Sequence, residues 1–214
     1  MGLVADLVAY YPQLIGGLWV SIRLAFLTFC IGIPGGLLLA IAAISKRNRI
    51  RIFSVTLIEI GRGTPALVVL QVVYFGLPVT LSGFVSAGVA LGLTTAAYTS
   101  EIIRGGLQAV PEGEIEAAQA LGMGRFSALR DVIIPQGMLI ALPALVSFCV
   151  IMFQATTLAF SIAVPELMSQ ARSISSSTFH YFNLFVIAGV MYGAITITAS
   201  ALIDRLERRL SRHL

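Results

Sequence analysis

The sequence predicts an all-α integral membrane protein of about five transmembrane helices, and three observations support this fold class. The chain of 214 residues is 57% hydrophobic and only 11% charged. Its mean hydropathy of +0.94 exceeds what an apolar core under a polar surface accommodates. Several stretches without Asp, Glu, Lys or Arg also exceed the ~20 residues that cross a bilayer as a helix. The chain is therefore expected to be one transmembrane domain over residues 1–214.

The uncharged stretches define the spans in order. Twenty-two uncharged residues precede the basic cluster Lys46–Arg51 and form the end of span 1. The 38 uncharged residues of Gly63–Ser100 are too many for one span and contain turn-forming residues at Gly76–Pro78, so they indicate a hairpin. Two later uncharged stretches complete the set. The predicted spans are residues 12–45, 52–77, 83–103, 136–158 and 181–203.

The distribution of basic residues predicts the orientation of these spans. Lys46–Arg51 contains four Lys and Arg residues, the loop 104–135 contains three, and the tail Arg205–Arg212 contains four. With five spans all eleven lie on one side, and the opposite side holds only Arg172. Short cytoplasmic loops carry the excess of Lys and Arg, so the N-terminus is expected outside and the C-terminus in the cytoplasm. The same distribution argues against a nucleic-acid partner, despite a net charge of +4.

The loop 104–135 is the most charged segment and sits between spans 3 and 4. Pro111 and the acidic residues after it favour the start of a helix. The alanines that follow are good helix formers, and Gly122 supplies a stop where a left-handed backbone is required. The small side chains make a smooth face that another surface can approach closely, with Ala118 expected on it. On this physical reasoning alone, the segment is either a solvated connector or a docking helix.

A long spaced motif distinguishes the two alternatives. Glu116-Ala117-Ala118, three residues, Gly122, nine residues and Val132–Pro135 resemble the EAA loop of permease subunits of ATP-binding-cassette importers. In that family the loop forms a coupling helix that docks on a cytoplasmic ATPase. The resemblance implies an ATPase-coupling role for the following residues: Glu116, Ala117, Ala118, Gln119, Ala120, Leu121 and Gly122.

The resemblance extends over most of the chain and is to the polar amino-acid branch, which includes histidine, arginine, glutamine and opine permeases. Its other carriers are Arg62–Pro65, Tyr74–Pro78, Ala97-Tyr98 with Glu101–Gly106, Val164–Leu167 and Leu206–Leu210. The resemblance implies uptake of a polar or charged amino acid across a bacterial inner membrane by alternating access. Its implied partners are a dimer of ATP-binding subunits, a second permease subunit and an extracytoplasmic amino-acid-binding protein. ATP and Mg would be bound by the ATPase, with no cofactor in this chain. At Gln154–Leu158 the chain departs from the branch, which favours a non-identical permease partner.

Polar residues within the predicted spans have two interpretations. Glu59 and Arg62 are three apart on one helix face, where they either pair for stability or line a translocation path or gate. Gln154, Thr156 and Thr157 either hydrogen-bond within and between helices or line a cavity. His180 is expected as a surface residue rather than a ligand.

The motifs also bear on catalysis. No nucleophile with a nearby base, no metal-ligand spacing and no phosphate-binding glycine motif occurs in the sequence, so no catalytic or metal site is predicted and the chain is not expected to be an enzyme. An ion-coupled secondary transporter of small solutes is the alternative function, but ionisable residues deep in the spans are sparse. A membrane-embedded enzyme is disfavoured because no span clusters His, Asp or Cys.

Overall fold

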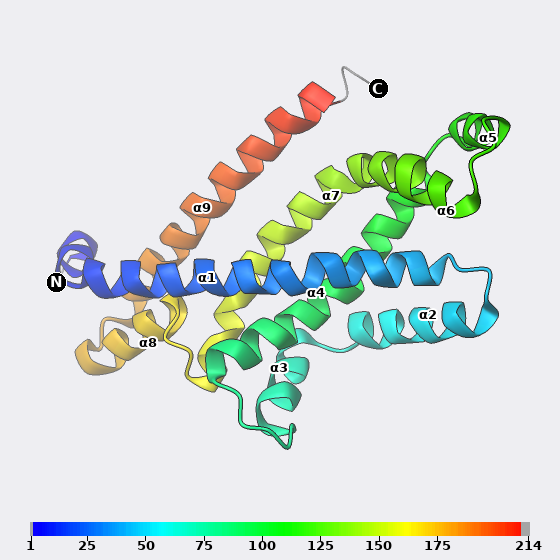
Figure 1. Cartoon of the computed structure of the whole chain (residues 1–214). Coiled ribbons are helices and arrows are strands. Elements are labelled where there is room, and N and C mark those ends of the chain that lie inside the picture. The colour runs from blue at the N-terminus through cyan, green and yellow to red at the C-terminus, as the bar shows by residue number, and fades with distance from the viewer. Residues whose placement is uncertain (1, 211–214) are drawn as a thin grey trace. The chain divides into compact units, whose positions relative to one another are not determined.

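The computed structural model describes the backbone of residues 2–210 and the side chains of these residues except 202 and 204–210. All secondary-structure elements in this part of the chain are helices joined by short loops, with no strand in it (Figure 1). The helices are α1 (Leu3–Ala43), α2 (Asn48–Gly63), α3 (Ala66–Phe75), α4 (Gly83–Gln108), α5 (Glu112–Ala120), α6 (Arg125–Ala128), α7 (Ile134–Ala155), α8 (Leu167–Thr178) and α9 (Tyr181–Leu210). A π-helical turn η1 (Leu129–Ile133) precedes α7, and a 3₁₀ segment η2 (Thr156–Ile162) follows it. The all-α prediction is confirmed.

Three helical segments of the described chain are long and apolar enough to cross a membrane: Leu3–Ala43, Arg125–Ile162 and Tyr181–Ala201. The pair α2 and α3 makes a fourth candidate if it counts as one broken span. Only 33%, 22% and 22% of the residues in the most apolar windows of the three are buried within the chain. Their outward apolar side chains require lipid or protein around them, as expected for a membrane protein. The count of five spans stays a prediction.

Helix α4 lies in the range predicted as span 3 and is long enough to cross a bilayer, yet it is rich in small and polar residues. Its hydroxyl side chains are buried rather than facing lipid: Ser86, Thr94, Thr95, Thr99 and Ser100. The Thr99 Oγ1 atom donates hydrogen bonds to the carbonyls of Gly32 and Thr95 at 3.2 and 2.7 Å. A Cβ added at Gly36 would lie 2.1 Å from Thr99 Oγ1. The small residues thus allow a close approach of α1 to α4.

The range 52–77, predicted as one continuous span, contains a break that the sequence analysis missed. Helix α2 ends at Gly63, and Thr64 adopts an extended backbone with φ −92° and ψ 127°. Pro65 disfavours a helical conformation in the residue before it and has no N–H for the helix ladder, so α3 begins only at Ala66. The Arg62–Pro65 motif therefore marks the point where two helices separate.

Helices also occur outside the predicted spans. Helix α1 begins at Leu3, before the predicted start of span 1 at residue 12. The segment between the last two predicted spans contains α8. Left-handed residues bound this helix, Ala163 at φ 58° and Phe179 at φ 60°. Two predictions fall on the C-terminal end of the chain: the basic tail Arg205–Arg212 and the motif Leu206–Leu210. The described part includes neither Arg212 nor the side chains of residues 205–210.

The chain divides into two compact units. One unit comprises residues 1–31, 65–92 and 149–214, and its core joins residues of α1, α7, α8 and α9, among them Leu14, Phe153, Leu167 and Leu184. The other comprises residues 32–64 and 93–148, and its core joins Ala40, Ile103, Leu107, Ala141 and Leu145. The predicted coupling loop lies entirely in the second unit.

Candidate functional site

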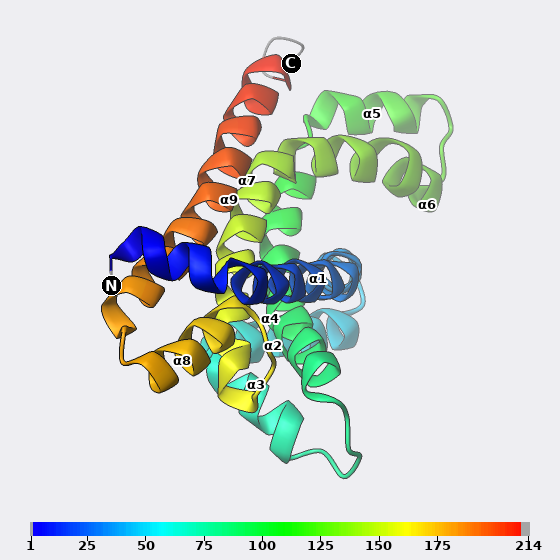
Figure 2. The same cartoon turned by 90° about the vertical axis from the view of Figure 1, so that its left-hand side faces the viewer.

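The charged loop folds into a short helix that leads into two further helical turns. Helix α5 occupies Glu112–Ala120, and Pro111 is its N-cap with φ −56° and ψ 136°. Glu112 and Glu114 lie in the first turn, where carboxylates interact favourably with the helix dipole. The acidic residues were thus correctly predicted to begin a helix, with Pro111 directly before the first turn. In Figure 2, α5 lies alongside the segment that contains α6.

The end of α5 is a Schellman motif built on a glycine. The Met123 N–H donates to the Ala118 carbonyl at 3.1 Å, and the Gly122 N–H donates to the Gln119 carbonyl at 2.9 Å. Gly122 has φ +74°, a left-handed conformation that glycine adopts without a steric cost. A Cβ at Gly122 would meet no atom within 4 Å, so the requirement for glycine comes from the backbone alone. The predicted left-handed stop is confirmed.

The exposure of the motif residues corrects one part of the docking prediction. Ala118, expected on the outer face, is only 3% exposed and packs within the chain. The exposed residues of the motif are Glu116, Ala117, Gln119, Ala120, Leu121 and Gly122. Leu121 is 82% exposed, which is costly for a leucine in water. At 100° per residue, Glu116 and Ala120 project from the side of α5 away from Ala118, and Ala117 and Gln119 project from its flanks.

The rest of the second unit holds α5 in place. Helix α5 contacts both α6 and η1. The Gln136 Nε2 atom at the start of α7 donates to the Glu114 Oε2 atom at 2.9 Å. Helix α7 in turn packs closely on α4, because a Cβ added at Gly106 on α4 would lie 2.4 Å from the carbonyl oxygen of Gly137 on α7. Helix α5 is thus connected to α7 by a hydrogen bond, and α7 to α4 by close backbone packing.

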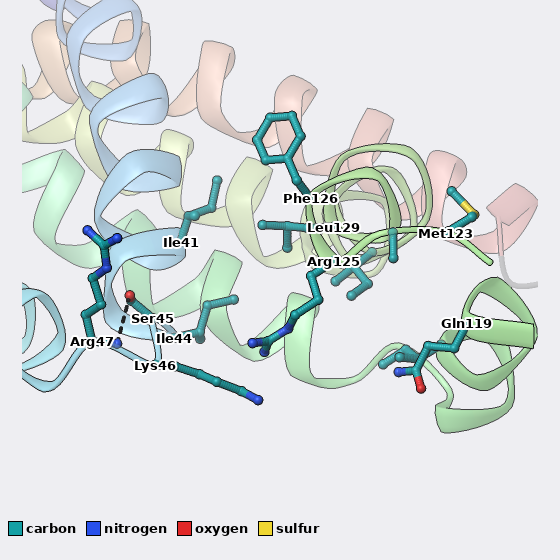
Figure 3. Close-up of a pocket in the computed structure, with 13 residues that line it drawn as sticks. Ile41, Ile44, Ser45, Lys46, Arg47, Gln119, Met123, Arg125, Phe126 and Leu129 are labelled. Carbon is teal, nitrogen blue, oxygen red and sulfur yellow. Dashed lines mark hydrogen bonds between the residues drawn. The ribbon is translucent and has the colours of Figure 1, made fainter.

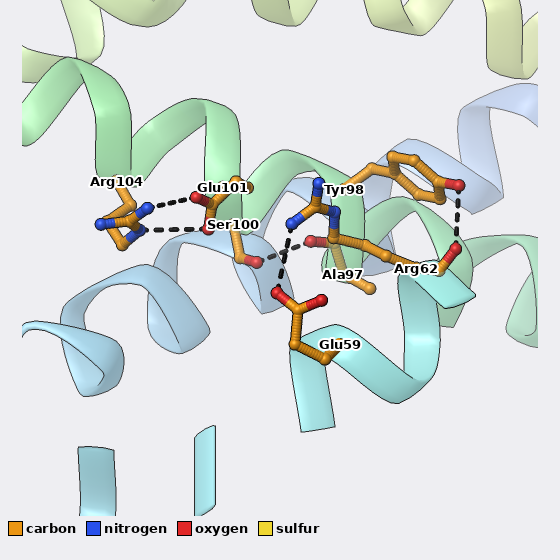
Figure 4. A network of polar contacts seen from close by, with 7 residues as sticks. All are labelled: Glu59, Arg62, Ala97, Tyr98, Ser100, Glu101 and Arg104. Carbon is orange, nitrogen blue, oxygen red and sulfur yellow. Dashed lines mark hydrogen bonds and ion pairs between the residues drawn. The ribbon is translucent and has the colours of Figure 1, made fainter. Parts of the chain in front are cut away.

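Glu59 and Arg62 form an ion pair on α2, with 3.4 Å between Arg62 Nη1 and Glu59 Oε1 (Figure 4). The Tyr98 hydroxyl on α4 donates to the Arg62 carbonyl at 3.1 Å, and the Arg62 guanidinium lies 6.0 Å from the Tyr98 ring centroid. Tyr98 also stacks on Phe148 of α7, with ring centroids 5.4 Å apart. The side chain of Glu59 is 65% exposed, so the pair is accessible. This geometry permits either predicted role, structural pair or path residue.

A second ion pair lies on α4 beside this network. Arg104 contacts both carboxylate oxygens of Glu101 and also donates to Gln108 Oε1 at 3.0 Å. Both charged side chains are about one-third exposed. The sequence analysis used these residues only as part of a motif, although their i, i+3 spacing is typical of a helical ion pair.

Three polar residues lie where α7 meets η2, and one of them is buried while another is exposed. Thr156 is fully buried, and its hydroxyl donates to the Phe153 carbonyl at 2.7 Å. The Thr157 hydroxyl donates to the Gln154 carbonyl at 2.8 Å. The Gln154 side chain is exposed. Thr156 therefore follows the packing interpretation, whereas the cavity interpretation stays open for Gln154 and Thr157. These three belong to the first unit, and Glu59 and Arg62 to the second.

Two polar clusters in the first unit were missed by the sequence analysis. Glu166, buried completely, caps α8 by accepting hydrogen bonds from the N–H groups of Met168 and Ser169 at 2.8 and 2.6 Å. The hydroxyls of Tyr192 and Ser21 reach the same carboxylate at 2.9 and 3.4 Å. The acidic residue directly before Leu167 was the available signal, since an acidic N-cap often begins a helix.

The second cluster joins the start of α1 to the start of α9. Asp6 is fully buried, and its carboxylate accepts from Asn183 Nδ2 at 2.6 Å. The other oxygen lies 2.9 Å from His180 Nδ1. His180 was predicted as a surface residue, but it is only 32% exposed and pairs with Asp6. His180 and Asn183 lie 174 and 177 positions from Asp6 in the sequence, so local sequence patterns cannot relate them to it.

Comparison with known proteins identifies the family. The model of the family described as binding-protein-dependent transport system inner membrane component matches residues 32–212. The chain belongs to this family. Its members are membrane permeases, so a multi-pass location in a bacterial inner membrane follows. The match covers the loop 104–135 and the last 12 residues of α1, and it does not include residues 1–31.

Individual proteins that are similar to this chain agree with this result. The chain is 39% identical over 197 residues to the histidine/lysine/arginine/ornithine transport system permease protein HisM of Salmonella typhimurium, covering 85% of this chain and 84% of that protein. It is 32% identical to the probable amino-acid ABC transporter permease protein YckA of Bacillus subtilis, covering 95% of this chain and 91% of that protein.

Solved structures support the fold. The chain matches a crystal structure of an amino acid ABC transporter with histidines at a TM-score of 0.89 and 38% identity, covering 96% of this chain and 97% of that one. An inward-facing structure of the MetNI methionine ABC transporter matches at a TM-score of 0.77 and 19% identity, covering 94% and 98%. The second match supports the fold alone. The permease fold predicted from the sequence is therefore confirmed.

Proposed function

We propose that this permease is the transmembrane subunit of an ATP-driven importer that carries a polar or charged amino acid into the cell. One observation carries the proposal: the EAA motif of a binding-protein-dependent permease is present here as a short helix with a glycine stop, and its residues 116–122 except Ala118 are exposed. The relatives named for histidine, lysine, arginine and ornithine transport support the substrate class.

We infer that α5 couples the permease to a separate ATPase. Its docking face is formed by Ala117, Ala120 and Leu121, which are exposed and apolar, with Glu116 and Gln119 as polar neighbours. Small side chains let a partner surface approach the helix backbone closely. Closure of the ATPase around bound ATP and Mg would move α5, and the Gln136–Glu114 hydrogen bond leads from α5 to α7. Alternating access then follows from movement of the spans.

The substrate path is assigned to polar side chains of the spans that are exposed, Gln154 and Glu59, or half-buried, Thr157 and Arg62. Gln154 and Thr157 near the end of α7 offer hydrogen-bonding groups, and Glu59 with Arg62 offers a charge pair on α2. Thr156 is left out of the path because its side chain is buried against its own helix. An ionised Glu59–Arg62 pair has groups for both the amine and the carboxylate of an amino acid.

The partners follow from the proposed mechanism. A dimer of ATP-binding subunits supplies hydrolysis, and an extracytoplasmic binding protein supplies the amino acid. A second permease subunit completes the translocation path. The Gln154-Ala155 pair departs from the polar residues common in the branch, which favours a paralogous second permease over an identical one.

Reconstitution tests this function directly. The permease is copurified with its ATPase and placed in lipid vesicles, and ATP hydrolysis and uptake are measured with a binding protein and a panel of amino acids. We expect polar or charged amino acids to stimulate both activities. Uptake driven by an H⁺ or Na⁺ gradient without ATP would instead support the secondary-transporter alternative.

A further inference from the structure

A cavity of ≈ 960 Å³ lies in the second unit between the end of α1 and the coupling loop (Figure 3). Its apolar wall includes Ile41 from α1, Ile44 just after that helix, and Leu129 and Ile133 from η1. In Figure 3, Ile41 and Leu129 point toward each other across the space. A pocket of this size with isoleucine and leucine walls suits an apolar chain better than a small ion.

The polar part of the same cavity has only one sign of charge. Lys46 and Arg47 from the α1–α2 loop and Arg125 from α6 line it, and no Asp or Glu does. All three are exposed, and none of them makes an ion pair with a described residue. Three unpaired cations beside an apolar wall therefore call for an anionic, amphipathic occupant.

The position of the cavity along the chain indicates where this occupant comes from. Helix α1 is a candidate membrane span that ends at Ala43, directly before the basic lining residues. The end of an apolar span lies at the membrane–water interface, where lipid phosphates are concentrated. Basic pockets next to transmembrane helices on the cytoplasmic side bind anionic headgroups, and the predicted orientation places this one there.

We propose that this cavity is a binding site for an anionic phospholipid. The phosphate lies among Lys46, Arg47 and Arg125, and the part of an acyl chain nearest the headgroup lies against Ile41 and Leu129. A free phosphate would use the same cations but leave the apolar wall in water. Because Met123 and Gln119 also line the cavity, a bound lipid contacts the C-terminal turn of the coupling helix.

The single tryptophan of the chain makes a direct binding assay possible. Trp19→Phe first removes the native fluorophore. Phe126→Trp then places a single reporter in the cavity lining, at a side chain that is 75% exposed and therefore tolerant of the change. The full-length protein is reconstituted in phosphatidylcholine vesicles with increasing brominated phosphatidylglycerol or brominated phosphatidylcholine. We expect the phosphatidylglycerol probe to quench the reporter at an at least tenfold lower mole fraction.

Two matched triple variants locate the site. Lys46→Gln, Arg47→Gln and Arg125→Gln remove the cations that line the cavity. Arg49→Gln and Arg51→Gln on α2 and Arg130→Gln on η1 remove the same charge from the neighbouring helical segments, at positions that do not line it. The preference for phosphatidylglycerol should fall about tenfold or more in the first variant and persist in the second.

Other outcomes overturn the proposal. Equal quenching by both lipids, or an equal loss in the two triple variants, would mean a general attraction to anionic membranes. Abolition of quenching by about 10 mM inorganic phosphate, compared with a control of equal ionic strength, would indicate an anion site without lipid. Loss of quenching on addition of the ATPase subunit in all lipid mixtures would show that the partner protein covers the cavity.

Discussion

The Tyr192 hydroxyl donates a hydrogen bond to the Glu166 carboxylate over 2.9 Å, in the buried interior of the first unit. With the two backbone N–H groups of α8, this contact satisfies a carboxylate that has no access to solvent. A buried charge requires such partners, because leaving it unpaired costs several kcal/mol. Glu166 therefore joins the capping of α8 to the position of α9.

Removal of the Glu166 side chain should destabilise the protein. In Glu166→Ala the Met168 and Ser169 N–H groups and the Tyr192 hydroxyl lose their acceptor, so we expect a loss on the order of 1–3 kcal/mol. Thermal unfolding of the detergent-solubilised permease measures this change. Tyr192→Phe, which removes one of these donors and leaves the cap, should show a smaller loss. An unchanged unfolding midpoint in Glu166→Ala would refute the assigned role.

The same carboxylate should make stability depend on pH. Burial raises the pKa of Glu166 above its usual 4.5, although hydrogen bonds from Met168, Ser169, Tyr192 and Ser21 lower it in part. The folded protein then holds a proton that the unfolded chain has lost, so stability falls as pH rises from about 4.5 through the raised pKa. The unfolding midpoint of the wild type should fall more steeply than that of Glu166→Gln across this window. Parallel curves would contradict the raised pKa.

Gly122 should tolerate asparagine better than β-branched residues. Its φ of +74° costs a residue with a Cβ about 1–2 kcal/mol, and no neighbouring atom adds a clash. Gly122→Val should misplace the end of α5 and reduce substrate-stimulated ATP hydrolysis in the complex, and Gly122→Asn should retain more of it because asparagine adopts the left-handed region more readily. Equal activity in both variants would mean that the helix end does not transmit movement.

Ala117 and Ala118 separate docking from internal packing. Ala118 is buried, so Ala118→Leu should overpack the contact of α5 and lower the stability of the isolated permease by about 1–3 kcal/mol. Ala117 is exposed, so Ala117→Leu should leave that stability unchanged and weaken retention of the ATPase during copurification. The matched changes should also differ in labelling, with Ala117→Cys reactive and Ala118→Cys protected. The reverse pattern would place the docking face on the other side of α5.

Gln154 and Thr156 should differ in their effect on substrate choice. Gln154 is exposed, and a hydrogen bond from it to a substrate is worth ~1 to 3 kcal/mol when the alternative is an unpaired group. Gln154→Ala should therefore change the relative affinities for amino acids by roughly 5- to 150-fold, whereas Thr156→Val should change stability only. Competition for uptake across a panel of amino acids measures the order. An unaltered order in Gln154→Ala would assign this residue to an interface instead.

The predicted orientation is tested by labelling in intact cells. In a background with Cys30→Ala and Cys149→Ala, cysteines at Ser82 and Ser176 should react with an impermeant thiol reagent, and a cysteine at Asn48 should not. All three positions are exposed in the structure, so a difference in labelling reports the side of the membrane. Reaction at Asn48 from outside would overturn the five-span topology.

Local patterns in the sequence predicted much of the proposed coupling site. The acidic residues after Pro111, the alanines and Gly122 together specify a short helix with a left-handed end, because each acts on the backbone within one turn. The break between α2 and α3 was locally determined as well, since Pro65 restricts Thr64, but the uncharged stretch around it obscured the signal. These features depend on neighbouring residues and can be read without a partner.

The sequence by itself determined the membrane class, the family and the conformation of α5, because composition, a long spaced motif and local backbone preferences carry that information. Only the tertiary structure decided which face of α5 is free, since burial of Ala118 depends on α6 and η1 packing beside it. It also decided that Asp6 meets His180 and that Ser21 meets Glu166. Such contacts join residues more than 100 positions apart, and only the packing of whole helices brings them together.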